Sequence, residues 1–242
     1  MESSLTLSRA TAVAPAPAVR QRIADDKAML RTAAELTRDL IAPRPGIYWA
    51  DLIASAAIGY GALAVAVSVQ GTGWVLLAAL VSALALYRAL SFIHEVSHIK
   101  HSALPRFRGL WNVLVGVPML VPSFMYEGVH NLHHAKTRYG TAEDPEYLPL
   151  ALMKPCTLPA FVVISALAPV GLLIRYAILS PLSLLSPTLR TIVMERYSAL
   201  AINPSFRRRA PEGEARMMWN RVEAAAATGG ARCSTNMARR TC

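Results

Sequence analysis

Charged residues are scarce in this chain. They make up 17% of its 242 residues, whereas about a quarter is usual in soluble domains. Hydrophobic residues make up 54%, yet the net charge is +10. Apolar segments joined by basic ones are typical of integral membrane proteins with basic cytoplasmic loops. A nucleic-acid-binding protein would share the charge but not the apolar content, so we expect no nucleic-acid partner.

Cysteine is also scarce, and its three residues are scattered at Cys156, Cys233 and Cys242. An odd number at irregular spacing predicts neither a disulfide framework nor a cysteine-based metal site. The N-terminus lacks the apolar run of a cleavable signal peptide before its first arginines. Residues 1–19 are rich in Ala, Pro and Ser and are expected to be disordered.

Residues 20–41 show helical spacing of apolar side chains and predict an amphipathic helix, so residues 1–44 form the N-terminal segment. Residues 50–69 and 74–93 are apolar stretches of the length that crosses a bilayer, about 20 residues. The turn between them carries no charge, whereas the flanks of the hairpin are rich in Lys and Arg. The positive-inside rule then places both termini and the histidines in the cytoplasm.

Two later apolar stretches are not expected to be simple crossings. Residues 109–125 are short and contain Pro118 and Pro122, which favours a re-entrant or in-plane segment. Residues 156–186 are interrupted by prolines and Arg175 and have basic residues on both sides, which favours a shallow hairpin or in-plane pair. We therefore predict an all-α integral membrane protein, in the inner membrane if bacterial, with one transmembrane hairpin and a cytoplasmic histidine-rich region.

All six histidines fall in two clusters. The first is His94, His98 and His101, spaced so that a helix carries them on one face. The second is His130, His133 and His134, in the sequence HNLHH. Imidazole nitrogen is a ligand for iron, zinc and copper. Because both clusters follow apolar segments on the same predicted side, we expect the six histidines to bind a binuclear metal centre at the lipid boundary.

Acidic residues beside the clusters allow further interpretations. HEVSH is a literal H-E-x-x-H, the zinc-protease pattern in which the glutamate is the general base. That reading leaves His101 and the second cluster without a role. We expect Glu95 instead to accept a hydrogen bond from a ligand imidazole, and Glu127 to be a polar neighbour of the site. The acidic run of Glu143, Asp144 and Glu146 is expected to be a solvated loop, with contact to a basic cofactor or carrier as the alternative.

The two clusters give the chain a resemblance to the membrane fatty acid desaturases. It rests on HEVSH, on HNLHH, and on SFMYEGVHNLHHAKTRYGTAEDPEYLPL, and it covers about residues 45–222. It implies an oxygen-dependent di-iron enzyme that introduces a cis double bond into a fatty acyl chain. The chain has no C-x-x-C and no His-Pro-Gly-Gly, so a ferredoxin or cytochrome b5 type donor is expected to act in trans. Related lipid hydroxylases and ketolases share these motifs, and no catalytic residue beyond the ligands is identified.

The chain departs from that family after its second cluster. The family has a third histidine box beyond another pair of crossings, but no histidine follows His134 here. We predict a partial desaturase domain at 45–222 and an aberrant or disordered tail at 223–242, as in a truncated or frameshifted desaturase. A non-enzymatic membrane fragment that binds metal is the alternative from another class.

Overall fold

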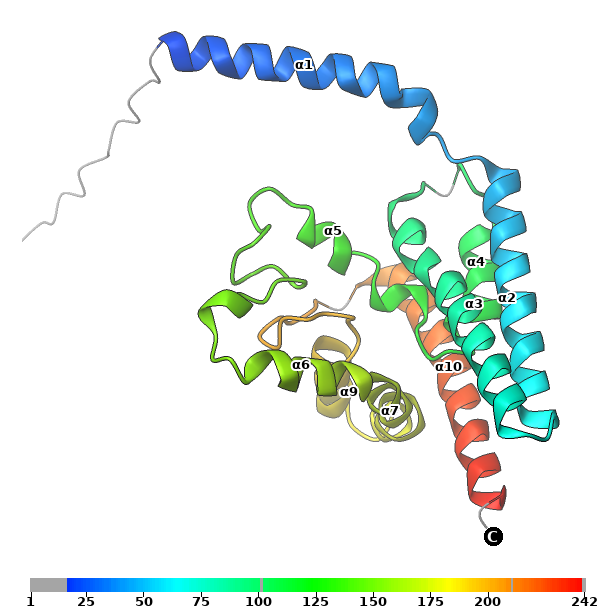
Figure 1. The fold of residues 1–242 in the computed structure, drawn as a ribbon. Coiled ribbons are helices and arrows are strands. Elements are labelled where there is room, and N and C mark those ends of the chain that lie inside the picture. The colour runs from blue at the N-terminus through cyan, green and yellow to red at the C-terminus, as the bar shows by residue number, and fades with distance from the viewer. Residues whose placement is uncertain (1–16, 101, 210, 241–242) are drawn as a thin grey trace, which may run out of the picture. The chain divides into compact units, whose positions relative to one another are not determined.

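A computed structural model describes residues 17–100, 102–209 and 211–240. It divides into two compact units, Met1–Pro43 and Arg44–Cys242, so the division lies one residue from the predicted boundary at 44. The described part of the chain contains helices and no strand (Figure 1). The predicted all-α class is therefore confirmed.

The first unit contains helix α1, Pro17–Ile41, where the sequence predicts an amphipathic helix. Its described leucines are exposed within this unit, as a helix that lies on a membrane surface requires. Surface binding by α1 stays a prediction, and residues 1–16 of the predicted disordered segment lie outside the described residues.

The second unit begins with a helical hairpin, α2 (Pro45–Ser68) and α3 (Thr72–His98). Both helices are long and apolar enough to cross a membrane, which confirms the predicted pair. Each helix begins before the apolar stretch predicted for it, and α3 also continues past its end. Pro45 is well suited to the first turn of α2 because its missing N–H would be unpaired there, and α3 continues through the histidines to His98. The predicted orientation of the hairpin stays a prediction.

Small residues let α2 and α3 approach closely. A Cβ added to Gly59 would lie 2.7 Å from Leu86 Cγ and 3.1 Å from the Leu86 backbone nitrogen. At the same level Ser82 Oγ donates a hydrogen bond of 2.9 Å to the Gly59 carbonyl. Gly61, two residues later in α2, has nothing within 4 Å of its added Cβ.

Trp111 connects the next segment to the hairpin. Its side chain is fully buried, and its Nε1 donates to the Ala89 carbonyl at 2.9 Å. Asn112 closes the same segment on itself, because its Oδ1 accepts from the Ser123 backbone N–H at 2.8 Å. The segment is a chain of short helices, as expected for a stretch too short to cross a membrane: α4 (Phe107–Trp111), the π-helical η1 (Asn112–Gly116) and the 3-10 helix η2 (Ser123–Met125).

The remaining chain before residue 197 is also built of short helices, separated by loops and prolines. Helices α6 and α7 to α8 bend by 53° at their junction, so they form either a broken span or a re-entrant pair, in line with the predicted non-straight stretch. The bounds of these elements are α5 (Val129–His133), η3 (Leu150–Leu152), α6 (Thr157–Ala166), α7 (Ala168–Ile174), the π-helical η4 (Arg175–Leu179), α8 (Ser180–Leu182) and α9 (Pro187–Arg196).

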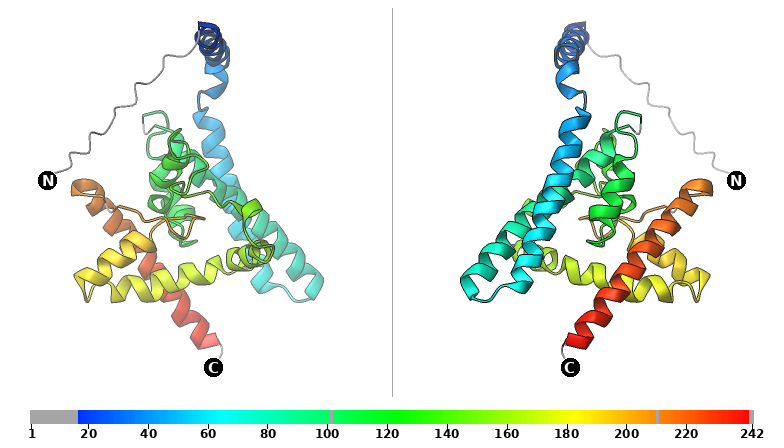
Figure 2. Two further views of the ribbon diagram at one scale, coloured as in Figure 1. Left: turned by 90° about the vertical axis from the view of Figure 1, so that its left-hand side faces the viewer. Right: turned by 90° about the vertical axis from the view of Figure 1, so that its right-hand side faces the viewer.

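The last helix, α10 (Gly213–Arg240), lies against η4 and α8 (Figure 2). Its Glu223 is 2% exposed and accepts hydrogen bonds from Arg175 at 2.7 Å and Arg190 at 2.5 Å. The predicted aberrant or disordered tail begins at this residue. The structure differs there, because α10 continues to Arg240 and Ala226 is also buried. The buried carboxylate supplies the counter-charge that Arg175 needs inside an apolar stretch.

Replacing Gly59 by Ala should lower the melting temperature of the full chain in detergent, whereas Gly61→Ala should not. Both substitutions gain about 0.5–1 kcal/mol of helix propensity, but the methyl group at 59 overlaps Leu86 and costs about 1–3 kcal/mol. Thermal unfolding followed by circular dichroism compares the two. Equal shifts would contradict the close approach of α2 and α3.

Glu223→Gln should destabilise the chain by about 3 kcal/mol, because it leaves Arg175 buried without a counter-charge. Burial alone would raise the pKa of Glu223, but the bonds from Arg190 and Arg175 outweigh it and lower the pKa. The difference between wild type and variant should therefore be full above pH 4.5 and shrink as the pH falls through the lower, folded-state pKa. Glu212→Gln, at an exposed site, is the control. A small, pH-independent difference would contradict the buried pair.

Candidate metal centre

Four histidines from the two sequence clusters meet at one place. His94 and His98 lie in the last turns of α3, and His130 and His134 lie at α5 and its C-terminal cap. One potential ligand atom from each lies within 4.8 Å of the others. Across the two segments, the ring centroids of His94 and His130 are 4.6 Å apart, and those of His98 and His134 are 5.0 Å apart.

The local helices explain why each pair shares one side. Residues four apart on a helix lie on the same face, so each segment presents two imidazoles together. The second pair is the closer one, with 3.0 Å between the Nε2 atoms of His130 and His134. His130 is buried and the other three are exposed.

The other two predicted ligands are placed differently. His133 is outside the group of four, and its Nδ1 lies 2.9 Å from Asp144 Oδ1. His101 lies outside the described residues. The assignment of all six histidines as ligands stays a prediction.

Glu146 and Tyr126 orient His130. The Nδ1 atom of His130 lies 2.8 Å from Glu146 Oε1 and 2.8 Å from the Tyr126 hydroxyl, which leaves Nε2 for the cluster. Burial lowers the pKa of His130, although the hydrogen bond from its Nδ1 to the Glu146 carboxylate opposes the shift. A lowered pKa favours the neutral imidazole, which is the form that binds metal. Burial and the Glu146 carboxylate raise the pKa of Tyr126 well above its ordinary value, so its hydroxyl stays protonated.

A matching arrangement supports His94 from α2. Glu95 Oε1 lies 3.3 Å from His94 Nδ1, and the Tyr48 hydroxyl donates to Glu95 Oε2 at 3.0 Å. Both clusters thus combine a tyrosine, a glutamate and a histidine. A carboxylate on the second ring nitrogen is the usual partner of a metal-binding imidazole. The geometry is compatible with the predicted role of Glu95, which stays a prediction.

Among the described hydrogen bonds, Glu127 makes none to a histidine. Its carboxylate is bonded to Arg108 instead. Glu127 Oε2 accepts from Arg108 Nη1 at 2.8 Å, and Arg108 Nη2 donates to the Val96 carbonyl at 3.1 Å. Val96 lies between His94 and His98 on α3, and Glu127 comes three residues before His130. Arg108 therefore ties together the two histidine-bearing segments.

Asp144 corrects the expectation of a solvated acidic loop. Its side chain is fully buried and accepts from His133 and from the backbone N–H groups of Gly140 and Glu146. Burial would raise the pKa of Asp144, but these hydrogen bonds outweigh it and lower the pKa. The sequence carries a signal for this turn: Gly140 has φ +70°, and an aspartate that binds nearby backbone N–H groups is typical of turns.

The donor set suits a transition metal. Four imidazole nitrogens match the preference of iron, zinc, copper and nickel. Metal–nitrogen bonds of about 2.0–2.1 Å allow two ligand atoms on one ion to lie at most about 4.2 Å apart. The four donor atoms lie within 4.8 Å of one another, so their spread is slightly wider than that of ligands already closed around one ion. The group of four is the one such cluster within the described residues.

Comparison with known proteins decides the family. A family model for fatty acid desaturases matches residues 71–234. The chain belongs to the fatty acid desaturase family. The match confirms the resemblance found in the sequence, and it continues past residue 222 to residue 234 within α10. This family is a di-iron enzyme class, and the four gathered histidines agree with it.

A curated relative of this desaturase-family chain is a ceramide hydroxylase from Caulobacter vibrioides (strain NA1000 / CB15N). It is 52% identical over 185 residues, which are 76% of this chain and 53% of the relative. The chain therefore spans about half the length of that relative. No solved structure gives a significant match.

Glu146→Gln should weaken metal binding by about 10–100-fold, because the amide no longer fixes His130 as a carboxylate does. Glu143→Gln, three residues away on an exposed side chain, should leave binding unchanged. The measurement is iron retained by the full chain against a graded series of chelator concentrations. Equal retention in both variants would show that Glu146 does not support the site.

Proposed function

We propose that the chain carries the iron-binding part of an O2-dependent membrane lipid oxidoreductase, and that its reaction is hydroxylation of the acyl chain of a ceramide-type lipid. The convergence of four histidines from α3 and α5 is the observation that carries the proposal. The family supports oxidation of a lipid acyl chain by a di-iron centre. The name of the ceramide hydroxylase relative favours hydroxylation over the desaturation expected from the sequence.

Both reactions need O2 and two electrons from outside. In hydroxylation, one C–H bond becomes C–OH and the second oxygen atom leaves as water, with two protons and two electrons consumed. In desaturation, two hydrogens leave neighbouring carbons and both oxygen atoms leave as water, again with two electrons. We propose that a ferredoxin or cytochrome b5 type protein supplies the electrons in trans, at a centre on the cytoplasmic side.

The protein residues hold and orient the centre. His94, His98, His130 and His134 would hold iron, and Glu146 and Glu95 would fix two of the rings. Bound iron with O2 supplies the oxidising power to break an unactivated C–H bond. We propose that further ligands for a second iron include His133 and His101.

The site lies at the end of α3, one of the two helices long enough to cross a membrane. We propose that an acyl chain from the bilayer reaches the histidines there without leaving an apolar environment.

The zinc-protease alternative uses two histidines and one glutamate of HEVSH. It is disfavoured because His130 and His134 join the same cluster and Glu95 is bonded to Tyr48. A metal-binding fragment without turnover is the second alternative, and it predicts metal without product.

The test is lipid oxidation by the full chain in membranes supplied in parallel with ceramide or with ceramide 1-phosphate, each together with ferredoxin and its reductase, NADPH and O2. We expect a product with one added oxygen atom, iron in the purified chain, and loss of both in His98→Ala. A product that has instead lost two hydrogen atoms would establish desaturation. Iron without any lipid product would support the fragment, and zinc with peptide cleavage abolished by Glu95→Gln would support the protease.

A further inference from the structure

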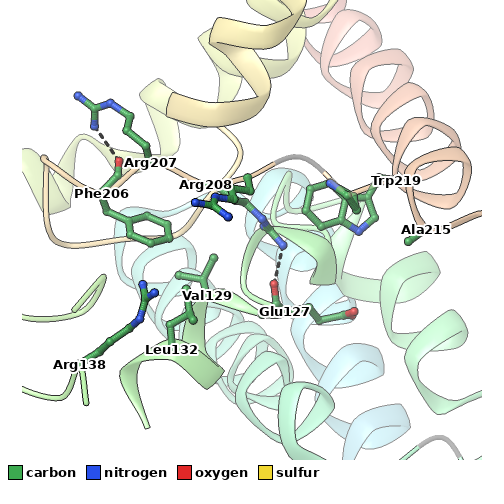
Figure 3. A pocket seen from close by; sticks show the side chains of 12 residues that line it. Glu127, Val129, Leu132, Arg138, Phe206, Arg207, Arg208, Ala215 and Trp219 are labelled. Carbon is green, nitrogen blue, oxygen red and sulfur yellow. Dashed lines mark hydrogen bonds between the residues drawn. The ribbon is translucent and has the colours of Figure 1, made fainter. Parts of the chain in front are cut away.

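A basic pocket lies on the side of α5 away from the metal centre. Its volume is about 610 Å³, and it is formed by α5, the segment 206–209 and the start of α10 (Figure 3). Val129 and Leu132 face this pocket. His130 and His134 come from nearly the opposite face of the same helix, because each residue advances about 100° around the axis. The short helix α5 therefore separates the pocket from the histidine cluster.

The charge of this pocket is strongly unbalanced. Four arginines line it, Arg138, Arg207, Arg208 and Arg209, against the single lining carboxylate of Glu127. Arg138 also lies 3.9 Å from Glu143, an exposed residue outside the lining. That carboxylate is already bonded through Oε2 to Arg108, which is not part of the lining. A cavity lined by guanidinium groups attracts phosphate or carboxylate, which accept two parallel hydrogen bonds from one arginine.

Arg208 is the most buried of the four, with 7% of its surface exposed. It donates to the backbone carbonyls of Phe124, Ser198 and Glu127, and its guanidinium lies 3.9 Å from the Trp219 ring centroid. Within the described part of the chain, none of its hydrogen-bond acceptors is a carboxylate. Burial lowers its pKa to about 9, although the nearby Glu127 carboxylate opposes the shift. The lowering reflects the cost of burying a charge. A bound anion would offset that cost.

The rest of the lining indicates an amphiphile. Apolar surface lies beside the arginines and is contributed by Val129, Leu132, Phe206 and Trp219. This surface suits the hydrocarbon part of a lipid next to its headgroup better than it suits a free inorganic ion. Glu127 Oε1 is buried and has no hydrogen-bond partner. It could accept a hydrogen bond from an amide N–H or hydroxyl group next to the anionic group.

We propose that this pocket binds the anionic headgroup of a membrane lipid, through a phosphate or carboxylate on the arginines and an adjacent N–H or O–H donor on Glu127. As a statement about substrate, this rests on the proposed function. The lipid presented to the histidine cluster would then carry an anionic headgroup and would not be a neutral ceramide.

The experiment compares two ligands that share one hydrocarbon part, ceramide 1-phosphate and ceramide. Binding to the full chain in neutral detergent is measured by microscale thermophoresis. We expect the phosphorylated lipid to bind at least about tenfold more tightly, with the preference falling as salt is added. Equal binding of the two lipids would overturn the proposal. Competition by inorganic phosphate at the concentrations of the phosphorylated lipid would reassign the pocket to free phosphate and overturn the lipid assignment.

Arg138→Gln, Arg207→Gln and Arg209→Gln, combined in one variant, should abolish the preference for the phosphorylated lipid. Arg208 is left in place because its bonds to three carbonyls connect separate segments. The matched control is Arg196→Gln, an exposed arginine at the end of α9 that is not part of the lining. A preference that survives in the triple variant, or is lost equally in the control, would contradict the pocket assignment.

This readout is independent of turnover. Absence of oxidised lipid together with selective binding would count against the proposed function while supporting the headgroup pocket. Oxidised lipid without selective binding would do the opposite.

Discussion

Arg108 makes the connection on which the metal centre depends. Its guanidinium donates to the Val96 carbonyl on α3 and to the Glu127 carboxylate just before α5. The two histidine pairs come from segments about thirty residues apart in the chain, and hydrogen bonds within each helix cannot fix the distance between them. One charged side chain that bonds to both segments can. Charge-assisted hydrogen bonds of this kind are stronger than neutral ones and fix geometry as well.

Besides Arg108, other hydrogen-bonded groups hold the site, some in contact with the histidines and others farther from them. Tyr48–Glu95 and Tyr126–Glu146 act on single rings. Arg208 secures the backbone that leads into α5 through the carbonyls of Phe124 and Glu127. Farther out, Glu223 joins η4 and α9 to α10 through Arg175 and Arg190. A site whose ligands must stay within a few ångströms requires such a framework, because loosely held ligands bind metal weakly.

The sequence predicts the large apolar features and the histidine pairs well, because both depend on spacing along one helix. The hairpin of α2 and α3 and the pairing of histidines within each segment follow from such patterns. The roles of Asp144 and Glu127 do not. Asp144 is buried because a turn and His133 supply its hydrogen bonds, and these partners are two to eleven residues away. Glu127 is directed to Arg108 by a tertiary contact, which no local pattern predicts.

The C-terminal residues 223–242 also show that local patterns do not predict tertiary contacts. Residues beyond 222 lack an apolar period, and the sequence therefore indicates disorder. Yet one glutamate, Glu223, meets a buried arginine that a periodicity argument treats as an interruption in an apolar stretch. Pairing between distant charges is invisible to local patterns, and it places the start of this region in the core.

The central claim is that the two histidine pairs bind one metal centre. The most direct measurement is a titration of the full chain with cobalt(II), followed by its visible absorption, in wild type, His98→Ala, His134→Ala and the double variant. A shared centre predicts strong coupling, so that either single substitution weakens binding about as much as both together. Losses in binding free energy that simply add would show two independent sites and would contradict the account.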